Sequence, residues 1–193
     1  MQTYFFIPAN RLHKLQAMQN LKIDQIIIDL EDAIKSSQRV GFIQDLASEI
    51  INREHYIRVP LYDQKNEIDV TLYQQLQKLG YHKFIFPKIQ SKHDFEIIAS
   101  KINEKESIVL LVETPLFLVQ LPQILEKFHH KIAGIGIGSH DLMNEIGGEH
   151  TLENISFYRN QILLLAKAYQ KTAFDIASME LKNEEIFKSE SRI

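Results

Sequence analysis

The segment IIIDLEDAI, residues 26–34, shows how this chain of 193 residues is built. Three isoleucines form a short apolar run, and the carboxylates Asp29, Glu31 and Asp32 follow it directly. Apolar, β-branched residues without polar alternation are typical of a strand that is buried on both faces of a parallel sheet. The segment therefore predicts a buried parallel strand that ends in a cluster of acidic side chains.

The same pattern recurs along the chain, with segments of helical spacing between the apolar runs. The predicted strands cover residues 3–8, 25–30, 56–59, 83–87, 108–113, 132–136 and 173–177. Gly80 is predicted to end a helix just ahead of a strand. Alternating strands and helices favour an α/β fold, either an open doubly wound sheet or a (β/α)8 barrel.

The turn after the first strand distinguishes these two folds. A dinucleotide-binding open sheet predicts a glycine-rich turn there, whereas this chain has Pro8, Ala9, Asn10 and Arg11. Polar residues instead follow the ends of several strands, where barrel enzymes build their sites. We therefore expect one domain over residues 1–193, a barrel of the TIM type. Because such barrels usually need about 250 residues, we expect the last strand–helix unit to be missing.

Composition excludes several classes of function. The chain has 22 Lys and Arg against 25 Asp and Glu, and this balance argues against nucleic-acid binding. The absence of cysteine excludes disulfides, thiolate metal sites and cysteine nucleophiles. The longest apolar runs, such as residues 108–112, are too short to cross a bilayer, and no secretory leader is visible. We expect a cytoplasmic protein that binds neither nucleic acid nor membranes.

Candidate catalytic groups lie at the ends of the predicted strands. Glu113 ends the fifth strand, Asp141 follows the sixth and Arg58 lies in the third. Carboxylates at the ends of parallel strands offer hard oxygen ligands that suit Mg²⁺ or Mn²⁺. A nearby arginine offers a planar fork for the carboxylate of a substrate. The pattern predicts a metal-dependent enzyme that acts on a carboxylic acid.

Structural alternatives exist for most of these residues. Several carboxylates could instead cap helix N-termini: Asp29, Glu31, Asp32 and Asp141. Arg58 could be an ion-pair partner inside the barrel. Glu113 follows five apolar residues, and a buried carboxylate is costly unless it is paired or bound to a metal, which favours a functional role.

Three further features have weaker interpretations. Gly136 and Gly138 lack the other residues of a phosphate loop, and we interpret them as a tight turn that lets the backbone approach a ligand. Lys88, at the end of the fourth strand, is a weak candidate for a Schiff-base lysine. His140 is expected to be an exposed loop residue, although it neighbours Asp141.

Six segments together resemble the citrate lyase β-subunit-like proteins of the HpcH/HpaI aldolase superfamily, which includes citryl-CoA, malyl-CoA and citramalyl-CoA lyases. They follow the family's order and spacing. They are FFIPANR at 5–11, IIIDLEDAI at 26–34, YIRVP at 56–60, FPKI at 86–89, LLVETP at 110–115 and GIGSHDLMNEIGG at 136–148. The resemblance extends over essentially the whole chain.

The resemblance implies a Mg²⁺-dependent lyase, with Mn²⁺ as a substitute, that cleaves a β-hydroxy acyl thioester into an acetyl-type thioester and a 2-oxo acid. It implies the following roles: Glu113 and Asp141 as metal ligands, Arg58 and Glu113 as catalytic and substrate-binding groups, Gly138 and Ser139 as further substrate contacts, and Glu31 and Asp32 as carboxylates that border the metal through water. The implied partners are CoA or an acyl-carrier thioester, a 2-oxo acid and further copies of the chain, with a trimer favoured.

The chain also departs from the family pattern. Gln2, Arg39 and Pro60 stand where the family commonly has Arg, Lys and Asn. The family's eighth strand and C-terminal lid are expected to be missing, which would lower activity. Two other functions therefore stay open, a metal-dependent aldolase that acts on free 2-oxo acids and a shortened, weakly active or inactive binding or assembly subunit.

Overall fold

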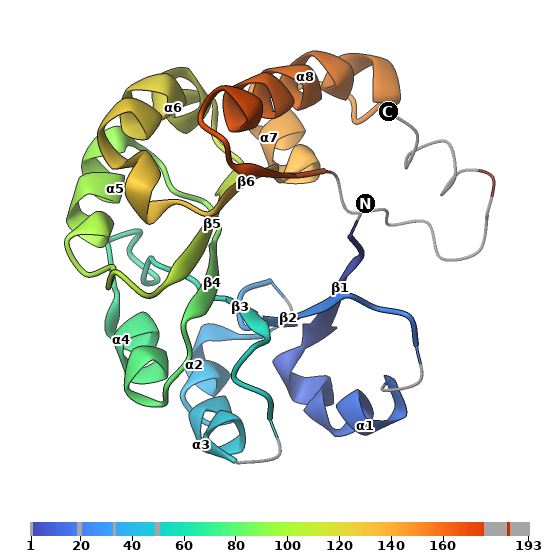
Figure 1. Cartoon of the computed structure of the whole chain (residues 1–193), viewed down its shortest axis with the longest axis vertical. Helices are drawn as coiled ribbons and strands as arrows, with labels where there is room; N and C mark the ends of the chain where they lie inside the picture. Colours follow the sequence, from blue (N-terminus) through green and yellow to red (C-terminus); the bar gives the residue numbers. More distant parts are fainter. Residues whose placement is uncertain (1, 19–20, 33, 49–50, 176–184, 186–193) are drawn as a thin grey trace. The chain divides into compact units, whose positions relative to one another are not determined.

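The computed structural model describes residues 2–18, 21–32, 34–48, 51–175 and 185. Its strands are β1 (Tyr4–Pro8), β2 (Gln25–Asp29), β3 (Tyr56–Arg58), β4 (Lys83–Phe86), β5 (Ser107–Val112), β6 (Gly134–Ile137) and β7 (Thr172–Phe174). Its α-helices are α1 (Leu15–Met18), α2 (Ser36–Arg39), α3 (Phe42–Ala47), α4 (Thr71–Lys78), α5 (Lys92–Ala99), α6 (Pro115–Phe128), α7 (Ser139–Ile146) and α8 (Leu152–Ala168). Two 3₁₀ helices, η1 (Ala9–Lys14) and η2 (His129–Lys131), complete these elements (Figure 1).

All seven predicted strands are present, so the prediction of an α/β chain is confirmed. Among the strand starts, the largest shift is in β6, which begins two residues later than the predicted range 132–136. Residues 176–177 of the last predicted strand lie outside the described residues. The predicted (β/α)8 barrel, the missing last unit and the single domain stay predictions. None of the described helices is long and apolar enough to cross a lipid bilayer.

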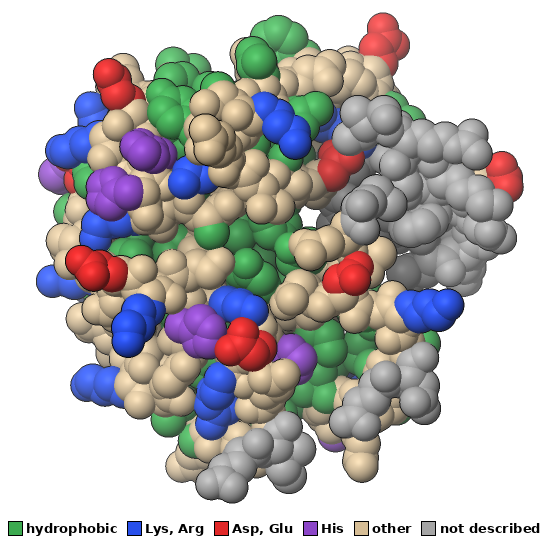
Figure 2. Space-filling view, viewed as in Figure 1, with side chains coloured by type: hydrophobic (Ala, Val, Ile, Leu, Met, Phe, Trp, Pro, Cys, Tyr) green, Lys and Arg blue, Asp and Glu red, His purple; other side chains and the backbone are tan. Residues whose placement is uncertain are grey.

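The chain divides into two compact units. One consists of Met1–Pro87 with Glu96–Ile108, and the other of Lys88–Phe95 with Val109–Ile193. Lys and Arg side chains are interspersed with Asp and Glu on the face drawn in Figure 2, as the balanced composition predicts.

Strands β1 to β4 of the first unit pair in parallel and in chain order. The register aligns Pro8 with Asp29, Asp29 with Arg58, and Arg58 with Ile85. Because aligned residues of neighbouring parallel strands face the same side of a sheet, the side chains of Asp29 and Arg58 become neighbours. The predicted helix stop is also confirmed, since Gly80 follows α4 with a φ of +88°, a conformation that favours glycine.

In the second unit, β6 pairs in parallel with both β5 and β7, and α8 packs against β6 and β7. The glycines of β6 give room to side chains of its neighbours. A Cβ on Gly134 would lie 2.6 Å from the Phe174 ring, and one on Gly136 would lie 2.8 Å from both Leu111 and Phe174. These alternate glycines therefore leave room for side chains of β5 and β7 above β6.

The interpretation of Gly136 and Gly138 as a tight turn is wrong. Gly136 lies inside β6, and Gly138 has an ordinary φ of −89°. Among the described glycines, only Gly80 and Gly147 have a positive φ. The two residues need to be small because side chains occupy the space above them, not because the backbone turns there.

Candidate functional site

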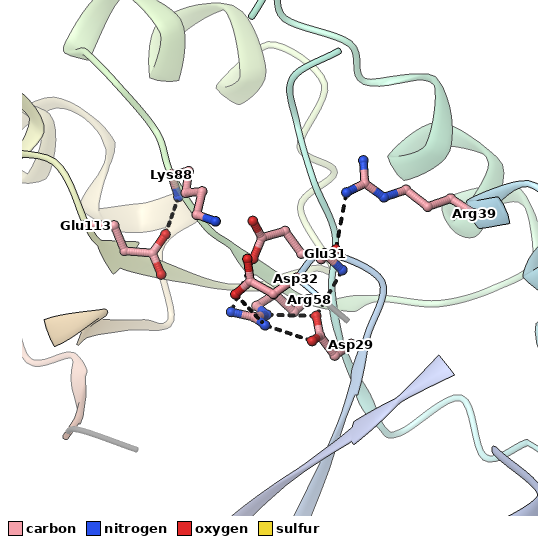
Figure 3. A network of polar contacts seen from close by, with 7 residues as sticks. All are labelled: Asp29, Glu31, Asp32, Arg39, Arg58, Lys88 and Glu113. Atoms are coloured by element: carbon pink, nitrogen blue, oxygen red, sulfur yellow. Dashed lines mark hydrogen bonds and ion pairs between the residues drawn. The ribbon is translucent and has the colours of Figure 1, made fainter. Parts of the chain in front are cut away.

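Arg58, the last residue of β3, is held between carboxylates in the first unit (Figure 3). Its Nε donates to Asp29 Oδ1 at 2.8 Å, and its Nη2 donates to Asp29 Oδ2 at 2.7 Å. This is the bidentate pairing that the planar guanidinium favours. Both side chains are largely buried, with 12% of Arg58 and 7% of Asp29 exposed. The pair follows directly from the register of β2 and β3.

Two more carboxylates complete the surroundings of Arg58. Glu31 Oε2 lies 3.2 Å from Nη1 as an ion pair, and Asp32 Oδ2 lies 3.0 Å from Nη2. The guanidinium also lies over the ring of Phe6, with Cζ 5.2 Å from the ring centroid. Burial alone would lower the pKa of Arg58, but its hydrogen bonds and the three negative charges raise that pKa above the ordinary value.

The structural alternative for Arg58, an ion-pair partner, is therefore what the geometry shows. Asp29, the partner with the shortest contacts, was not among the predicted site residues. Asp29 Oδ1 also accepts a hydrogen bond from the Glu31 N–H at 2.9 Å, so this carboxylate orders the loop that follows β2. Its position at the end of β2 was visible in the sequence, but its alignment with Arg58 required the strand register.

The predicted alternative that Asp29, Glu31 and Asp32 cap a helix is wrong. The next helix, α2, begins at Ser36 after Lys35. Arg39, on α2, instead contacts this loop: its Nη2 donates to the backbone oxygen of Glu31 at 3.2 Å (Figure 3). The side chains of Asp29 and Arg39 thus hold the backbone N–H and the backbone oxygen of Glu31.

Glu113 follows β5 in the second unit and is the most deeply buried carboxylate of the predicted site, with 2% of the residue exposed. Its Oε2 accepts a hydrogen bond from the backbone N–H of Lys88 at 2.6 Å (Figure 3). Lys88 has a φ of +53°, which is unusual for a residue other than glycine. The backbone of Lys88 therefore has a defined role toward Glu113.

Gly138, directly after β6, provides the seat for Glu113. A Cβ at this position would lie 2.2 Å from Glu113 Cγ and 2.3 Å from Oε1.

The residues after Glu113 fix the start of α6, because Thr114 Oγ1 accepts from the Phe117 N–H and Pro115 is the first helical residue. Thr114 also donates to Ile89 O at 3.0 Å. The Glu-Thr-Pro sequence thus places a buried carboxylate on a fixed strand-to-helix turn.

Helix α7 begins directly after Gly138 and carries Ser139, His140 and Asp141 in its first turn. Its first backbone bond runs from the Leu142 N–H to Gly138 O at 3.0 Å, so the three preceding N–H groups lie outside the helix's own hydrogen-bond ladder. Asp141 is partly buried, and within the part of the chain that the structure describes its carboxylate has no hydrogen bond or ion pair. This helix start presents polar groups that a ligand could satisfy.

The predicted site residues therefore form two groups, one in each unit. Arg58, Glu31 and Asp32 are brought together in the first unit, whereas Glu113 contacts Gly138 just before Ser139 and Asp141 in the second. Among the described residues, no three His, Cys, Asp or Glu side chains are grouped so that they could hold a metal ion by themselves. His140 is exposed, as expected, but it lies in the first turn of α7 and not in a loop.

We predict that Asp29→Asn lowers the free energy of unfolding by about 2 kcal/mol, because it weakens a buried, bidentate, charge-assisted pair. Asp32→Asn is the matched control. Asp32 contacts the same Nη2 atom, but 49% of its side chain is exposed, so its loss should cost less than about 1 kcal/mol. Urea denaturation followed by circular dichroism measures both values. Equal costs for the two variants would contradict the assigned importance of the Asp29 pair.

We predict that Gly138→Ala displaces the Glu113 side chain and lowers the free energy of unfolding by about 1–3 kcal/mol, because the new methyl group overlaps a buried carboxylate. Gly148→Ala is the control, since its Cβ would meet only the flexible end of Met143, at 2.4 Å. Denaturation and a crystal structure of each variant test this. An unmoved Glu113 in Gly138→Ala would show that the overlap is relieved elsewhere.

Several known proteins are similar to this chain. Residues 2–193 match the sequence profile of the HpcH/HpaI aldolase/citrate lyase family. The β subunit of citrate lyase from Haemophilus influenzae is 27% identical over 210 residues, which cover all of this chain and 71% of that protein. A (3S)-malyl-CoA thioesterase of Cereibacter sphaeroides is 23% identical over 194 residues, which cover 98% of this chain and 67% of that protein.

A solved structure shares the fold. The protein CitE from Mycobacterium tuberculosis, in complex with magnesium, acetoacetate and coenzyme A, superposes with a TM-score of 0.77 at 22% identity. The superposition covers 98% of this chain and 70% of that one. Because the family profile spans almost every residue and the strands that carry its motifs are present, the chain belongs to the HpcH/HpaI aldolase/citrate lyase family.

Proposed function

We propose that this chain is a Mg²⁺-dependent carbon–carbon lyase that cleaves a β-hydroxy acyl thioester of the citryl-CoA or malyl-CoA type into an acetyl-type thioester and a 2-oxo acid. The observation that carries the proposal is Glu113, a buried carboxylate fixed by the Lys88 N–H and seated on Gly138. Family membership supports it, as does the related structure with magnesium, acetoacetate and coenzyme A.

The donor set of the second unit fits a hard divalent cation. Mg²⁺ commonly binds one or two carboxylates and completes its shell with water and substrate oxygens, so a site of two carboxylates is sufficient. Glu113 and Asp141, which has no partner among the described residues, would be those ligands, and Mn²⁺ would bind to the same oxygens. The chemistry that the bound ion supplies is Lewis-acid polarisation of the oxygen that becomes the ketone of the 2-oxo acid.

The start of α7 would bind the carboxylate of the 2-oxo acid. The N–H groups of its first turn lie outside the helix ladder, and the helix dipole favours negative charge there. Gly138 directly precedes this turn, and Ser139 is its first residue. These groups would orient the acid before and after the carbon–carbon bond breaks.

Arg58 would bind a carboxylate at the acid end of the substrate. Its contacts to Asp29 are buried, whereas Asp32 is half exposed and shares Nη2 with Asp29. A substrate carboxylate could therefore replace Asp32 at Nη2 without breaking the pair between Arg58 and Asp29. Glu31 and Asp32, which contact the same guanidinium, would border the cation through water. Assembly into a homo-oligomer, as a trimer, and location in the cytoplasm stay predictions.

We predict that Glu113→Gln weakens Mg²⁺ and Mn²⁺ binding by at least about tenfold, because an amide oxygen lacks the charge of a carboxylate. Asp141→Asn should have a similar effect, and Glu126→Gln on the exposed side of α6 serves as the control. Calorimetric titration measures the affinities. Release of a 2-oxo acid from citryl-CoA, malyl-CoA and citramalyl-CoA is then assayed with Mg²⁺ and with a chelator. Unchanged affinity in both variants, or no release from any thioester, would overturn the proposal.

We predict that Arg58→Lys weakens the binding of 2-oxo acids by about tenfold and leaves metal affinity within about twofold, because an ammonium cannot form the paired contacts of a guanidinium. The probes are oxaloacetate, pyruvate and glyoxylate, titrated in the presence of Mg²⁺. Arg159→Lys on α8, whose guanidinium pairs with Asp175, is the control. Equal binding of the acids by wild type and Arg58→Lys would remove Arg58 from the substrate site.

A further inference from the structure

His150, in the second unit, contacts both residues that open α7. Its Nε2 is hydrogen-bonded to Ser139 Oγ at 2.8 Å. Its ring stacks on the ring of His140, with centroids 3.6 Å apart and planes only 7° from parallel. One side chain thus holds two consecutive residues of the first turn by two different interactions.

The loop between α7 and α8 brings His150 back to the start of α7. Gly147 ends α7 in the left-handed conformation, with a φ of +77°, and the Gly148 N–H donates to Met143 O at 2.9 Å. The chain then returns along the helix, and Thr151 caps α8 by accepting from the Asn154 N–H at 3.2 Å. His150 is therefore fixed by helix ends on both sides of it.

Ser139 and His140 directly precede Asp141, and the first turn of a helix is held by few backbone bonds of its own. Side-chain contacts from outside the helix consequently decide how well this turn is ordered. A serine hydroxyl beside a histidine nitrogen could also form a nucleophile and its base. Ser139 is only 4% exposed, however, which favours a hydrogen bond with a structural purpose.

We propose that His150 is a positioning residue for the divalent-metal site: it holds the first turn of α7 through Ser139 and His140 and so fixes the carboxylate of Asp141. This inference rests on the proposed function, because Asp141 is a metal ligand only there. Groups that orient a metal ligand without touching the metal typically change affinity by about 10–100-fold when they are removed.

Titration of the full chain with Mn²⁺ and with Mg²⁺ tests the proposal. His150→Ala should weaken binding of both ions by about tenfold or more. The matched control is His130→Ala. His130 also contacts another histidine ring in the same unit, that of His129, but it lies in η2 and not beside α7. Failure of the wild-type chain to bind either ion overturns the proposed function and this role with it. Metal binding that His150→Ala leaves unchanged overturns the positioning role alone.

Hydrogen exchange tests the ordering of the turn without any metal. The Leu142 N–H, which makes the first backbone bond of α7, should exchange on the order of tenfold faster in His150→Ala than in wild type. Amides in the middle of α8 should keep their rates, which shows that the variant is folded. Unchanged exchange at Leu142 would contradict the proposal whatever the metal affinity.

Two further variants separate the interactions. His150→Phe keeps a ring that can stack on His140 but lacks the nitrogen that bonds Ser139, and Ser139→Ala removes the same bond from its other end. The two substitutions should weaken metal binding equally. The variant that carries both, His150→Phe with Ser139→Ala, should bind the metal as tightly as either single variant. Additive losses would show that Ser139 and His150 act independently and would contradict the proposed link.

Discussion

The burial of one positive charge governs the first unit of this protein. A guanidinium that is removed from water must be paired and hydrogen-bonded, since an isolated buried charge is very costly. Arg58 satisfies this requirement through Asp29, its register partner on β2, and through two carboxylates of the next loop. The strand register, the loop after β2 and the position of Arg58 therefore depend on one another, and a change in any of them would leave a charge unpaired.

The second unit depends on the small size of alternate residues along one face of its central strand. Gly134 and Gly136 receive side chains from β7 and β5, and Gly138 receives the Glu113 carboxylate. The isoleucines between these glycines are buried on the opposite side of the strand. The same alternation thus provides both the packing of the strands and the seat of the buried acid. The Glu113 carboxylate is therefore held in place without a ligand.

The two groups of candidate residues differ in what they still need. The charge of Arg58 is balanced by acids, and Glu31 and Asp29 are buried beside it. The start of α7, by contrast, offers N–H groups outside the helix ladder and a carboxylate without a described partner. Such groups gain most from a ligand, because binding satisfies them without breaking existing bonds. This is why α7, and the loop that returns to it, have a central place in the proposed chemistry.

The sequence by itself determined the elements of this protein. Short apolar, β-rich runs predicted all seven strands, and five apolar residues before Glu113 predicted a buried acid, because both patterns depend only on neighbouring residues. Six motifs in order predicted the family. Only the tertiary structure decided which distant residues meet. The pairing of Asp29 with Arg58 depends on strand register, the seat of Glu113 on Gly138 depends on contact between two strands, and the return of His150 to α7 depends on the path of a loop. Periodicity along a chain does not encode such contacts, because they arise from packing between segments that the sequence separates.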